Sequence, residues 1–373
     1  EKGVSAAATI TRFDATKFRS RIACEVKDYD WTQYFDRKEI RKYDPFAQWA
    51  MISADEALKD SGIVGDESID LERVGVIWGS GTGGTTTFYE ESKGYIEGNY
   101  TPRFSPFFVP RMVVDLAAGF ISIKYGFMGP NYSTVSACAS SNHAMIDALN
   151  LIRWGKADMI VTGGSEASIN DPGVGSFCGM QALSTYNDDP AHASRPFDKD
   201  RNGFVIGEGG GALIFEELEH AQKRGAKIYC EVVGGGMSAD AYHMTAPHPE
   251  GKGAMMAMRE ALRDAGLEPE DIDYINAHAT STKQGDMFEA MAIDKLFRGE
   301  HALVASTKSM TGHECWMAGA SEVVYSLIMM LNDFVAPNIN LENPDEYSEH
   351  LNIPRETVET KLNTILSNSF GFG

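Results

Sequence analysis

The sequence predicts an α/β protein made of two similar halves. Along its 373 residues, short apolar segments that suit buried strands alternate with segments of helical periodicity, which is typical of parallel strands covered by helices. A helix end at 56–63, EALKDSGI, returns at 260–267 as EALRDAGL, and each copy precedes a strand. A Ser-Thr pair before a helix likewise occurs at 133–134 and again at 306–307. The order helix–strand–strand–helix thus occurs twice, unless common helix ends resemble each other by chance.

The individual elements follow from their ends and their apolar content. Pro45 near the start and Gly62 at the end bound the first helix. In the first half we also expect strands at 74–78, 159–165 and 211–216, a strand that turns into a helix at 131–152, and a helix at 217–225. In the second half we expect a strand at 274–278 and a helix at 317–331.

A glycine-rich loop at 79–84 follows the first strand and matches G-x-G-x-x-G. A dinucleotide site would need a helix and then a second strand ending in an acidic residue. The Pro- and Phe-rich segment at 99–110 indicates an extended excursion instead. We therefore interpret the loop as a tight turn and not as a cofactor site.

Composition argues against several classes of function. A formal charge of −20 disfavours nucleic acid and anionic membranes as partners, and no apolar run reaches the length of a membrane helix. The cysteines are odd in number and form no C-x-x-C pair, which favours free thiols in a reducing cytoplasm over disulfides or a zinc site. They stand at positions 24, 138, 178, 230 and 315.

Cys138 is the candidate nucleophile. It lies where a short β segment beginning at Asn131 turns abruptly into a helix with Met145, Leu149 and Ile152 on its apolar face. Free backbone N–H groups and the helix dipole at such a turn favour a thiolate. Because most lone cysteines are only small buried hydrophobic residues, a catalytic interpretation needs partners.

Two histidines and a lysine occupy the matching strand ends of the second copy. His278 ends the strand at 274–278, and Lys308 and His313 follow the repeated Ser-Thr pair. Ligands bind at the carboxyl ends of parallel strands, so we expect these side chains to meet Cys138. A single histidine at a strand end is usually structural, but the three residues together indicate a catalytic group.

Four separated motifs resemble the β-ketoacyl-acyl-carrier-protein synthases, most closely the elongating type II enzymes of bacteria. They are SACAS at 136–140, NAHATSTKQGD at 276–286, STKSMTGH at 306–313 and NSFGFG at 368–373. The resemblance covers essentially the whole chain. It implies a thiolase-like α/β fold with five layers, α-β-α-β-α, and two duplicated halves. The first half, 1–222, would carry the nucleophile and a dimer or cap insertion, and the second, 223–373, the His/Lys/His group and a gating loop.

The resemblance also implies a reaction. An acyl group held by Cys138 would condense with malonyl-acyl-carrier protein, with loss of CO₂, to give the 3-oxoacyl-carrier protein of fatty-acid elongation. His278 and His313 would activate the malonyl group. Lys308, paired with Glu322, would hold the histidines in place.

Other positions match the family residue by residue. The resemblance assigns substrate contacts to Phe177, Asp240, Thr280, Thr282, Phe370 and Phe372. Asp286 would be a structural support, and the backbone N–H groups of Cys138 and Phe372 would bind the oxyanion. Substrates would arrive on the 4′-phosphopantetheine of acyl carrier protein, so no metal or cofactor is implied.

Two protein interfaces are also implied. Lys38, Arg41 and Lys42 match the family's landing patch for the acidic carrier protein, although a solvated helix face at 37–42 is the alternative. The excursion at 85–125 would join two copies into a homodimer.

The chain departs from the family pattern at two positions near the site. Ala279 stands where glycine is usual, and Trp316 where glycine is common. We hypothesise that Trp316 reshapes the acyl tunnel, with a core tryptophan as the alternative. A specialised polyene or polyketide synthase therefore stays open. A non-catalytic partner of the chain-length-factor kind characteristically lacks the nucleophile, and the pair His278/His313 points away from thiolases and initiating synthases.

Overall fold

The computed structural model describes residues 2–298 and 301–372. Its larger sheet has the strand order β4-β3-β5-β7, where β3 pairs in parallel with β4 and β5, and β7 runs antiparallel to β5. The strands are Asn131–Thr134 (β4), Val74–Gly79 (β3), Met159–Glu166 (β5) and Gly209–Glu216 (β7). Every residue of β3 and β5 is buried, as their continuous apolar sequences predict for strands covered on both faces.

A second, smaller sheet lies in the C-terminal half and is parallel throughout. Its order is β12-β8-β9, formed by Ile365–Ser367, Tyr274–Asn276 and Leu303–Ala305. Ile275 of the central strand lies between Leu366 and Val304 and is fully buried. Both sheets therefore place their central strands deep in a core, with their carboxyl ends leading to the candidate catalytic residues.

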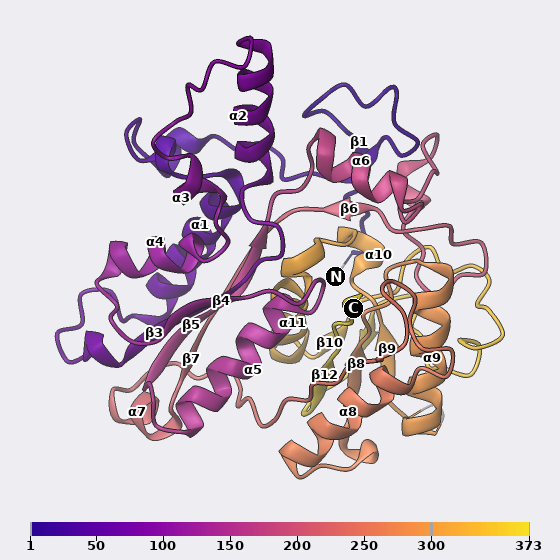
Figure 1. Cartoon of the computed structure of the whole chain (residues 1–373). Helices are drawn as coiled ribbons and strands as arrows, with labels where there is room; N and C mark the ends of the chain where they lie inside the picture. The colour runs from indigo at the N-terminus through magenta and orange to yellow at the C-terminus, as the bar shows by residue number, and fades with distance from the viewer. Residues whose placement is uncertain (1, 299–300, 373) are drawn as a thin grey trace.

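Helices cover and separate the two sheets, so the chain forms five layers (Figure 1). The outer layer on the larger sheet holds α1 and α4, the middle layer holds α5 and α11, and the outer layer on the smaller sheet holds α8 and α9. Their bounds are Pro45–Ser61 (α1), Leu116–Tyr125 (α4), Ser140–Arg153 (α5), Ala318–Leu331 (α11), Lys252–Ala265 (α8) and Lys283–Phe297 (α9). The α-β-α-β-α architecture that the family resemblance implied is confirmed.

Smaller elements decorate this frame. Ala8–Thr9 (β1), Ile22–Cys24 (β2) and Ile206–Gly207 (β6) form a three-stranded sheet, and Phe334–Val335 (β10) pairs with Val358–Glu359 (β11). Short helices are Phe108–Met112 (α3), Asp171–Gly179 (α6), Leu218–Lys223 (α7) and Lys308–Thr311 (α10). Single 3-10 turns are Trp31–Gln33, Ile40–Lys42, Leu71–Arg73, Pro190–His192, Pro269–Asp271 and Cys315–Met317.

The predicted repeat is present in the fold. The order α1, β3, β4, α5 in the first half returns as α8, β8, β9, α11 in the second. Asp44 caps α1 with its side chain, and Gly62 ends it in the left-handed conformation at φ 72°. Local sequence signals therefore set the ends of the first helix, as Pro45 and Gly62 predicted.

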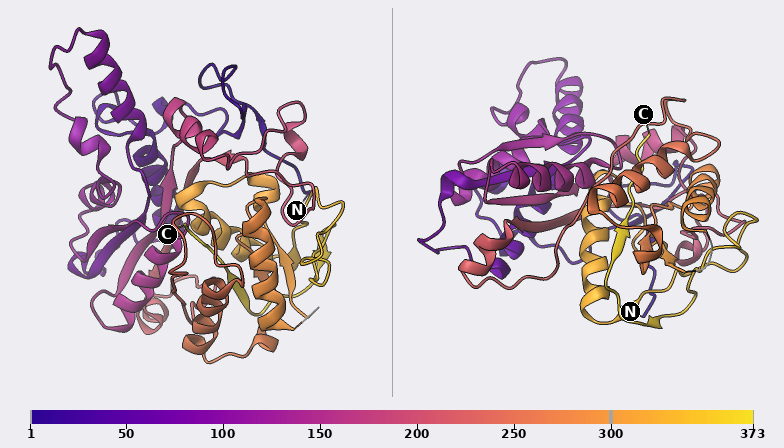
Figure 2. Two further views of the ribbon diagram at one scale, coloured as in Figure 1. Left: turned by 45° about the vertical axis from the view of Figure 1, so that its right-hand side comes forward. Right: turned by 90° about the horizontal axis from the view of Figure 1, so that it is seen from below.

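The residues after the glycine loop differ from expectation. A helix that the sequence did not predict, Thr85–Glu97 (α2), follows the loop at 79–84, whereas residues 99–107 of the Pro- and Phe-rich segment lie in neither helix nor strand and α3 begins at Phe108. This region stands out from the body of the molecule (Figure 2). Glycine in this loop allows another segment to pack closely against it, because a Cβ on Gly79 would lie 2.5 Å from the backbone nitrogen of Ser141. Gly79 thus lets α5 pack directly on the end of β3.

The part of the chain that the structure describes contains no helix with both the length and the apolar character needed to cross a membrane.

Candidate active site

The turn between β4 and α5 presents Cys138. Ala137 adopts φ 48°, in the left-handed region, and turns the chain sharply just before the cysteine. The Ser140 hydroxyl stabilises the turn, since it donates to the Ala137 carbonyl at 2.6 Å and accepts from the Ser136 N–H at 2.9 Å. Cys138 therefore lies at a strand-to-helix turn, as predicted from the sequence.

Cys138 contacts His313 directly. The distance from its Sγ to His313 Nε2 is 3.1 Å, and both residues are buried. Burial raises the pKa of the Cys138 thiol to about 12, although the nearby Lys308 charge opposes the shift. Burial, then Lys308, lowers the pKa of His313 well below its usual 6.5. Desolvation therefore opposes the thiolate that the helix terminus was expected to favour, and it disfavours the charged form of both the thiol and the imidazole.

His278 completes the group from the end of β8. Its ring centre lies 5.3 Å from that of His313, and the two planes are nearly perpendicular at 87°. Burial lowers the pKa of His278 well below 6.5, helped by Lys308 and by His313. The structure thus brings Cys138, His278 and His313 together, and both histidines are poised to act as neutral imidazoles.

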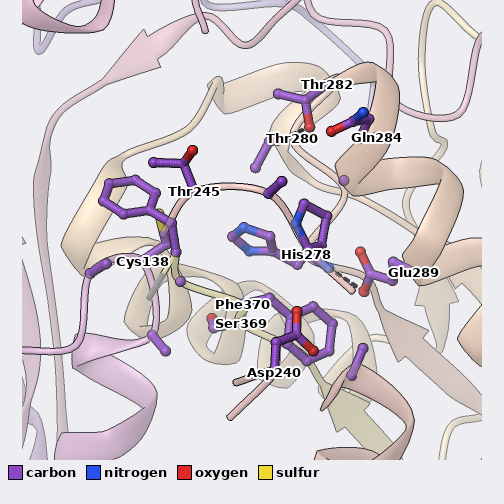
Figure 3. Close-up of a pocket in the computed structure, with 18 of the residues that line it drawn as sticks. Cys138, Asp240, Thr245, His278, Thr280, Thr282, Gln284, Glu289, Ser369 and Phe370 are labelled. Carbon is purple, nitrogen blue, oxygen red and sulfur yellow. Dashed lines mark hydrogen bonds between the residues drawn. The ribbon is translucent and has the colours of Figure 1, made fainter. Parts of the chain in front are cut away.

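Glu289 of α9 fixes the backbone on which His278 stands. Its carboxylate accepts the His278 N–H at 2.8 Å and the Ala279 N–H at 2.7 Å. It also accepts from the Asn368 side chain at 3.1 Å, which ties the C-terminal loop to the same carboxylate. Figure 3 shows Glu289 reaching this backbone beside His278.

Lys308 lies in the first turn of α10 and is fully buried with Glu322 of α11, to which its ammonium group is ion-paired. Burial raises the pKa of Glu322, and Lys308 opposes that shift. Asn276 at the end of β8 donates to the Glu322 carbonyl at 3.2 Å. The pair thus links the two motifs that carry the histidines, and its positive end acts on both rings.

These groups open into a cleft of about 1000 Å³. The substrate contacts predicted from the sequence all line it: Phe177, Asp240, Thr280, Thr282, Phe370 and Phe372. Figure 3 shows Thr280 and Thr282 on one side of His278, and Asp240 and Phe370 on the other.

Both sides of the cleft are braced by hydrogen bonds. The hydroxyls of Thr280 and Thr282 lie 3.1 Å apart. Asp240 holds its own loop by accepting the His248 N–H at 2.8 Å and the Gly253 N–H at 3.0 Å.

Asp286 supports the threonine side of the cleft. It is fully buried and accepts backbone N–H groups of Phe197 at 2.9 Å, Ser281 at 3.2 Å and Thr282 at 3.1 Å. Burial raises its pKa to about 6, while Arg201 and these bonds oppose the rise. The predicted supporting position of Asp286 is consistent with these contacts.

The basic cluster is separate from the cleft. Lys38, Arg41 and Lys42 are exposed at the 3-10 turn Ile40–Lys42, and none of them is among the described residues that line the cleft. The solvated helix face at 37–42, which was the alternative to a landing patch, is thus only a single 3-10 turn at Ile40–Lys42.

Three contributors to the site were not expected from the sequence. Glu289 could have been suspected, because it is an acidic residue among the apolar positions of its helix. The ring centres of Phe204 and His313 lie 5.2 Å apart in an edge-to-face arrangement, and nothing in the local sequence of Phe204 predicts this contact. Gly371 is needed for close approach, since a Cβ there would lie 2.6 Å from the Ser136 carbonyl oxygen.

Among the described residues, Cys138, His278 and His313 also form a set with the chemistry of metal ligands. Their ligand atoms lie within 4.8 Å of one another. The same three side chains carry the candidate chemistry, and the sequence expectation of a metal-free reaction stays a prediction.

Two family models divide the chain between them. The model of the β-ketoacyl synthase N-terminal domain matches residues 1–221, and that of the C-terminal domain matches residues 229–342. The chain belongs to the β-ketoacyl synthase family. Among curated relatives, 3-oxoacyl-[acyl-carrier-protein] synthase 2 of Coxiella burnetii is 49% identical over 381 residues, which cover 100% of this synthase and 90% of the relative.

Solved structures agree with this assignment. A β-ketoacyl synthase from Burkholderia phymatum has a TM-score of 0.92 and 34% identity, covering 100% of this chain and 90% of that one. A ketosynthase solved with its type II polyketide acyl-carrier protein, and bound to the hexaketide, gives a match with a TM-score of 0.90 and 29% identity, covering 99% of this synthase and 90% of that chain.

Proposed function

We propose that this β-ketoacyl synthase is an acyltransferase of fatty-acid elongation that joins malonyl-acyl-carrier protein to an acyl group on Cys138, releasing CO₂ and 3-oxoacyl-carrier protein. The observation that carries the proposal is the buried group in which His313 Nε2 lies 3.1 Å from Cys138 Sγ, with His278 facing the same space. The relative in Coxiella burnetii is named for the same reaction product.

The first step transfers the acyl group. The sulfur of Cys138 attacks the thioester carbonyl of the acyl-carrier protein, and its proton passes through His313 to the departing pantetheine thiol. The oxyanion that forms lies near the backbone N–H of Cys138. A Cβ on Gly371 would be 3.2 Å from that nitrogen, so the C-terminal loop runs beside the proposed oxyanion site.

The second step uses the two neutral imidazoles. With Cys138 acylated, His278 and His313 bind the thioester oxygen of the malonyl group by hydrogen bonds, and the C–C bond to the carboxylate breaks to give CO₂ and an enolate. The enolate carbon attacks the acyl carbonyl on Cys138, a C–C bond forms and the sulfur leaves. Burial lowers the pKa of both rings, and the charge of Lys308 lowers it further because it disfavours a second positive charge close by.

Acyl carrier protein is the partner that this chemistry requires, and its phosphopantetheine supplies the only carrier group involved. We propose Lys38, Arg41 and Lys42 as its landing patch, because they are exposed and basic in a chain of net charge −20. The cytoplasmic location inferred from the unpaired cysteines stays a prediction.

A second copy of the chain is the proposed partner of the excursion at 85–125. This region exposes large apolar side chains, among them Phe88, Val109 and Ile123. The exposed rings of Phe88 and Phe104 both lie against Phe108, with ring centres 6.2 and 5.5 Å away, so these side chains form one apolar patch, which is typical of protein interfaces. A chain-length-factor-like role is not favoured, since the nucleophile and its histidine are in contact.

Two variants test the assignment. Cys138→Ala should form no acyl adduct in intact-mass measurements after incubation with acyl-carrier protein. His278→Asn should still acylate Cys138 but should release CO₂ from malonyl-carrier protein about 10²-fold or more slowly. Condensation at the normal rate by Cys138→Ala would refute the proposal, and loss of acylation with normal decarboxylation in His278→Asn would reverse the assigned roles.

A further inference from the structure

Trp316 fills the apolar region next to the nucleophile. It lies in the turn between His313 and α11, is only 6% exposed, and belongs to the same buried apolar cluster as Cys138. Its ring centre lies 6.2 Å from that of Phe177 and 5.9 Å from that of Phe372, both of which line the cleft. An indole at this place therefore backs the cleft wall on two sides.

The indole is fastened to the loop after β3. Its Nε1–H donates to the Thr82 hydroxyl at 3.2 Å. A Cβ on Gly81 would lie 2.5 Å from Trp316 Cγ, so the ring occupies the space that any larger residue at 81 would need. The hydrogen bond and the missing Cβ together hold the ring flat against this loop, which leads directly into α2.

An acyl chain on Cys138 must enter this apolar cluster. Cys138 shares its surroundings with Phe177, Phe204 and Cys315, all of which line the cleft and belong to the cluster. Hydrocarbon gains free energy only by contact with such apolar walls. Trp316 lies behind Phe177 and Phe372 of the cleft wall, and its ring fills the space between them and Gly81.

We propose that Trp316, fastened to Gly81 and Thr82, closes the acyl-binding region behind Cys138 and limits the enzyme to short- and medium-chain acyl groups. The inference rests on the proposed function and adds the substrate class to it. A buried tryptophan covers about 150–250 Å², and a methylene about 30 Å². Removal of the indole thus makes room for about five to eight carbons of acyl chain.

The test measures acylation of Cys138 by intact mass, with carrier protein bearing saturated acyl groups from butyryl to stearoyl. As the acyl chain is lengthened toward stearoyl, the acylation rate of the unaltered enzyme should fall by at least about 10-fold, because one methylene too many for a closed pocket already changes the rate by about that factor. Trp316→Gly should acylate with the longer chains about 10-fold or more faster than the unaltered enzyme, and its acylation rate with short chains should change little. Trp316→Phe, which keeps a smaller ring, should extend the limit by about one two-carbon unit.

Trp154→Ala is the matched control, because it removes an exposed tryptophan whose side chain is 67% accessible at the end of α5. Its length profile should equal that of the unaltered enzyme. An unaltered enzyme that carries stearoyl as readily as butyryl, or an unchanged profile in Trp316→Gly and Trp316→Phe, overturns the inference while leaving the proposed function standing. The absence of any acyl adduct, at every chain length, overturns the proposed function and the inference with it.

Discussion

Replacement of Glu289 by Gln tests whether the backbone beneath His278 sets the rate of decarboxylation. Glu289 uses one oxygen for the His278 N–H and the Asn368 amide, and the other for the Ala279 N–H. A glutamine has one acceptor oxygen and one NH₂ group of the same shape. In the variant, one backbone N–H must therefore face another donor inside the protein.

The size of the effect follows from these contacts. Ala279 is 1% exposed, so water cannot replace the lost acceptor, and a buried unsatisfied donor costs about 1–3 kcal/mol. With about 2.1 cal/mol/K of unfolding entropy per residue, 373 residues give about 0.8 kcal/mol/K, so the melting temperature should fall by about 1–4 °C. If the backbone relieves the conflict by moving His278 about 1 Å, decarboxylation should slow by about 10²-fold.

Single-turnover release of CO₂ from malonyl-carrier protein measures the catalytic effect, and intact mass measures acylation of Cys138. Burial raises the pKa of Glu289 to about 6, so the assay belongs above pH 7, where the carboxyl is ionised. Acylation should change little, because His313 keeps its contact with Cys138. Asp294→Asn, on the same helix, is the control and should leave both rates unaltered. Normal decarboxylation by Glu289→Gln with an unchanged melting temperature would refute the reasoning.

Two further predictions concern charge. Because burial lowers the pKa of His278 well below 6.5 in the folded chain, only the unfolded chain takes up this proton as the pH falls below about 6.5. Acidification from about pH 6.5 to 5 should therefore lower the free energy of unfolding of the unaltered protein more steeply than that of His278→Asn, by up to about 1.4 kcal/mol per pH unit. Parallel pH dependences of the two proteins in denaturant titrations would contradict the assigned shift. Reversal of Lys38, Arg41 and Lys42 to Glu should raise KM for carrier-bound substrate by about 10-fold at low salt and leave a free pantetheine thioester unaffected. The same reversal at the exposed residues Lys59, Lys156 and Lys223 is the control, and an equal effect there would remove the landing-patch proposal.

Cys138 and the two histidines show how much of the site could be predicted from the sequence. Cys138, His278 and His313 stand in short motifs at strand ends, and the repeat of the two halves predicted that these ends face each other. Glu289 lies eleven residues beyond His278 on the next helix, and it could not be assigned because its partners are backbone N–H groups. The sequence identifies the Glu289 carboxylate, but which backbone N–H groups donate to it depends on how the chain folds.

The sequence by itself predicted most strands and helices of two similar halves, because periodicity and helix ends are local properties, and the resemblance of its motifs to the β-ketoacyl synthases implied the five-layer fold and the catalytic groups. Only the tertiary structure decided the electrostatic surroundings and the packing of these groups. It buries Cys138 beside Lys308 and His313, so that desolvation raises the pKa of a thiol that its helix terminus alone would lower. It also places Trp316 against Gly81, more than two hundred residues away in the chain. Dielectric surroundings and packing partners arise from contacts between distant segments, and these exist only once the chain has folded.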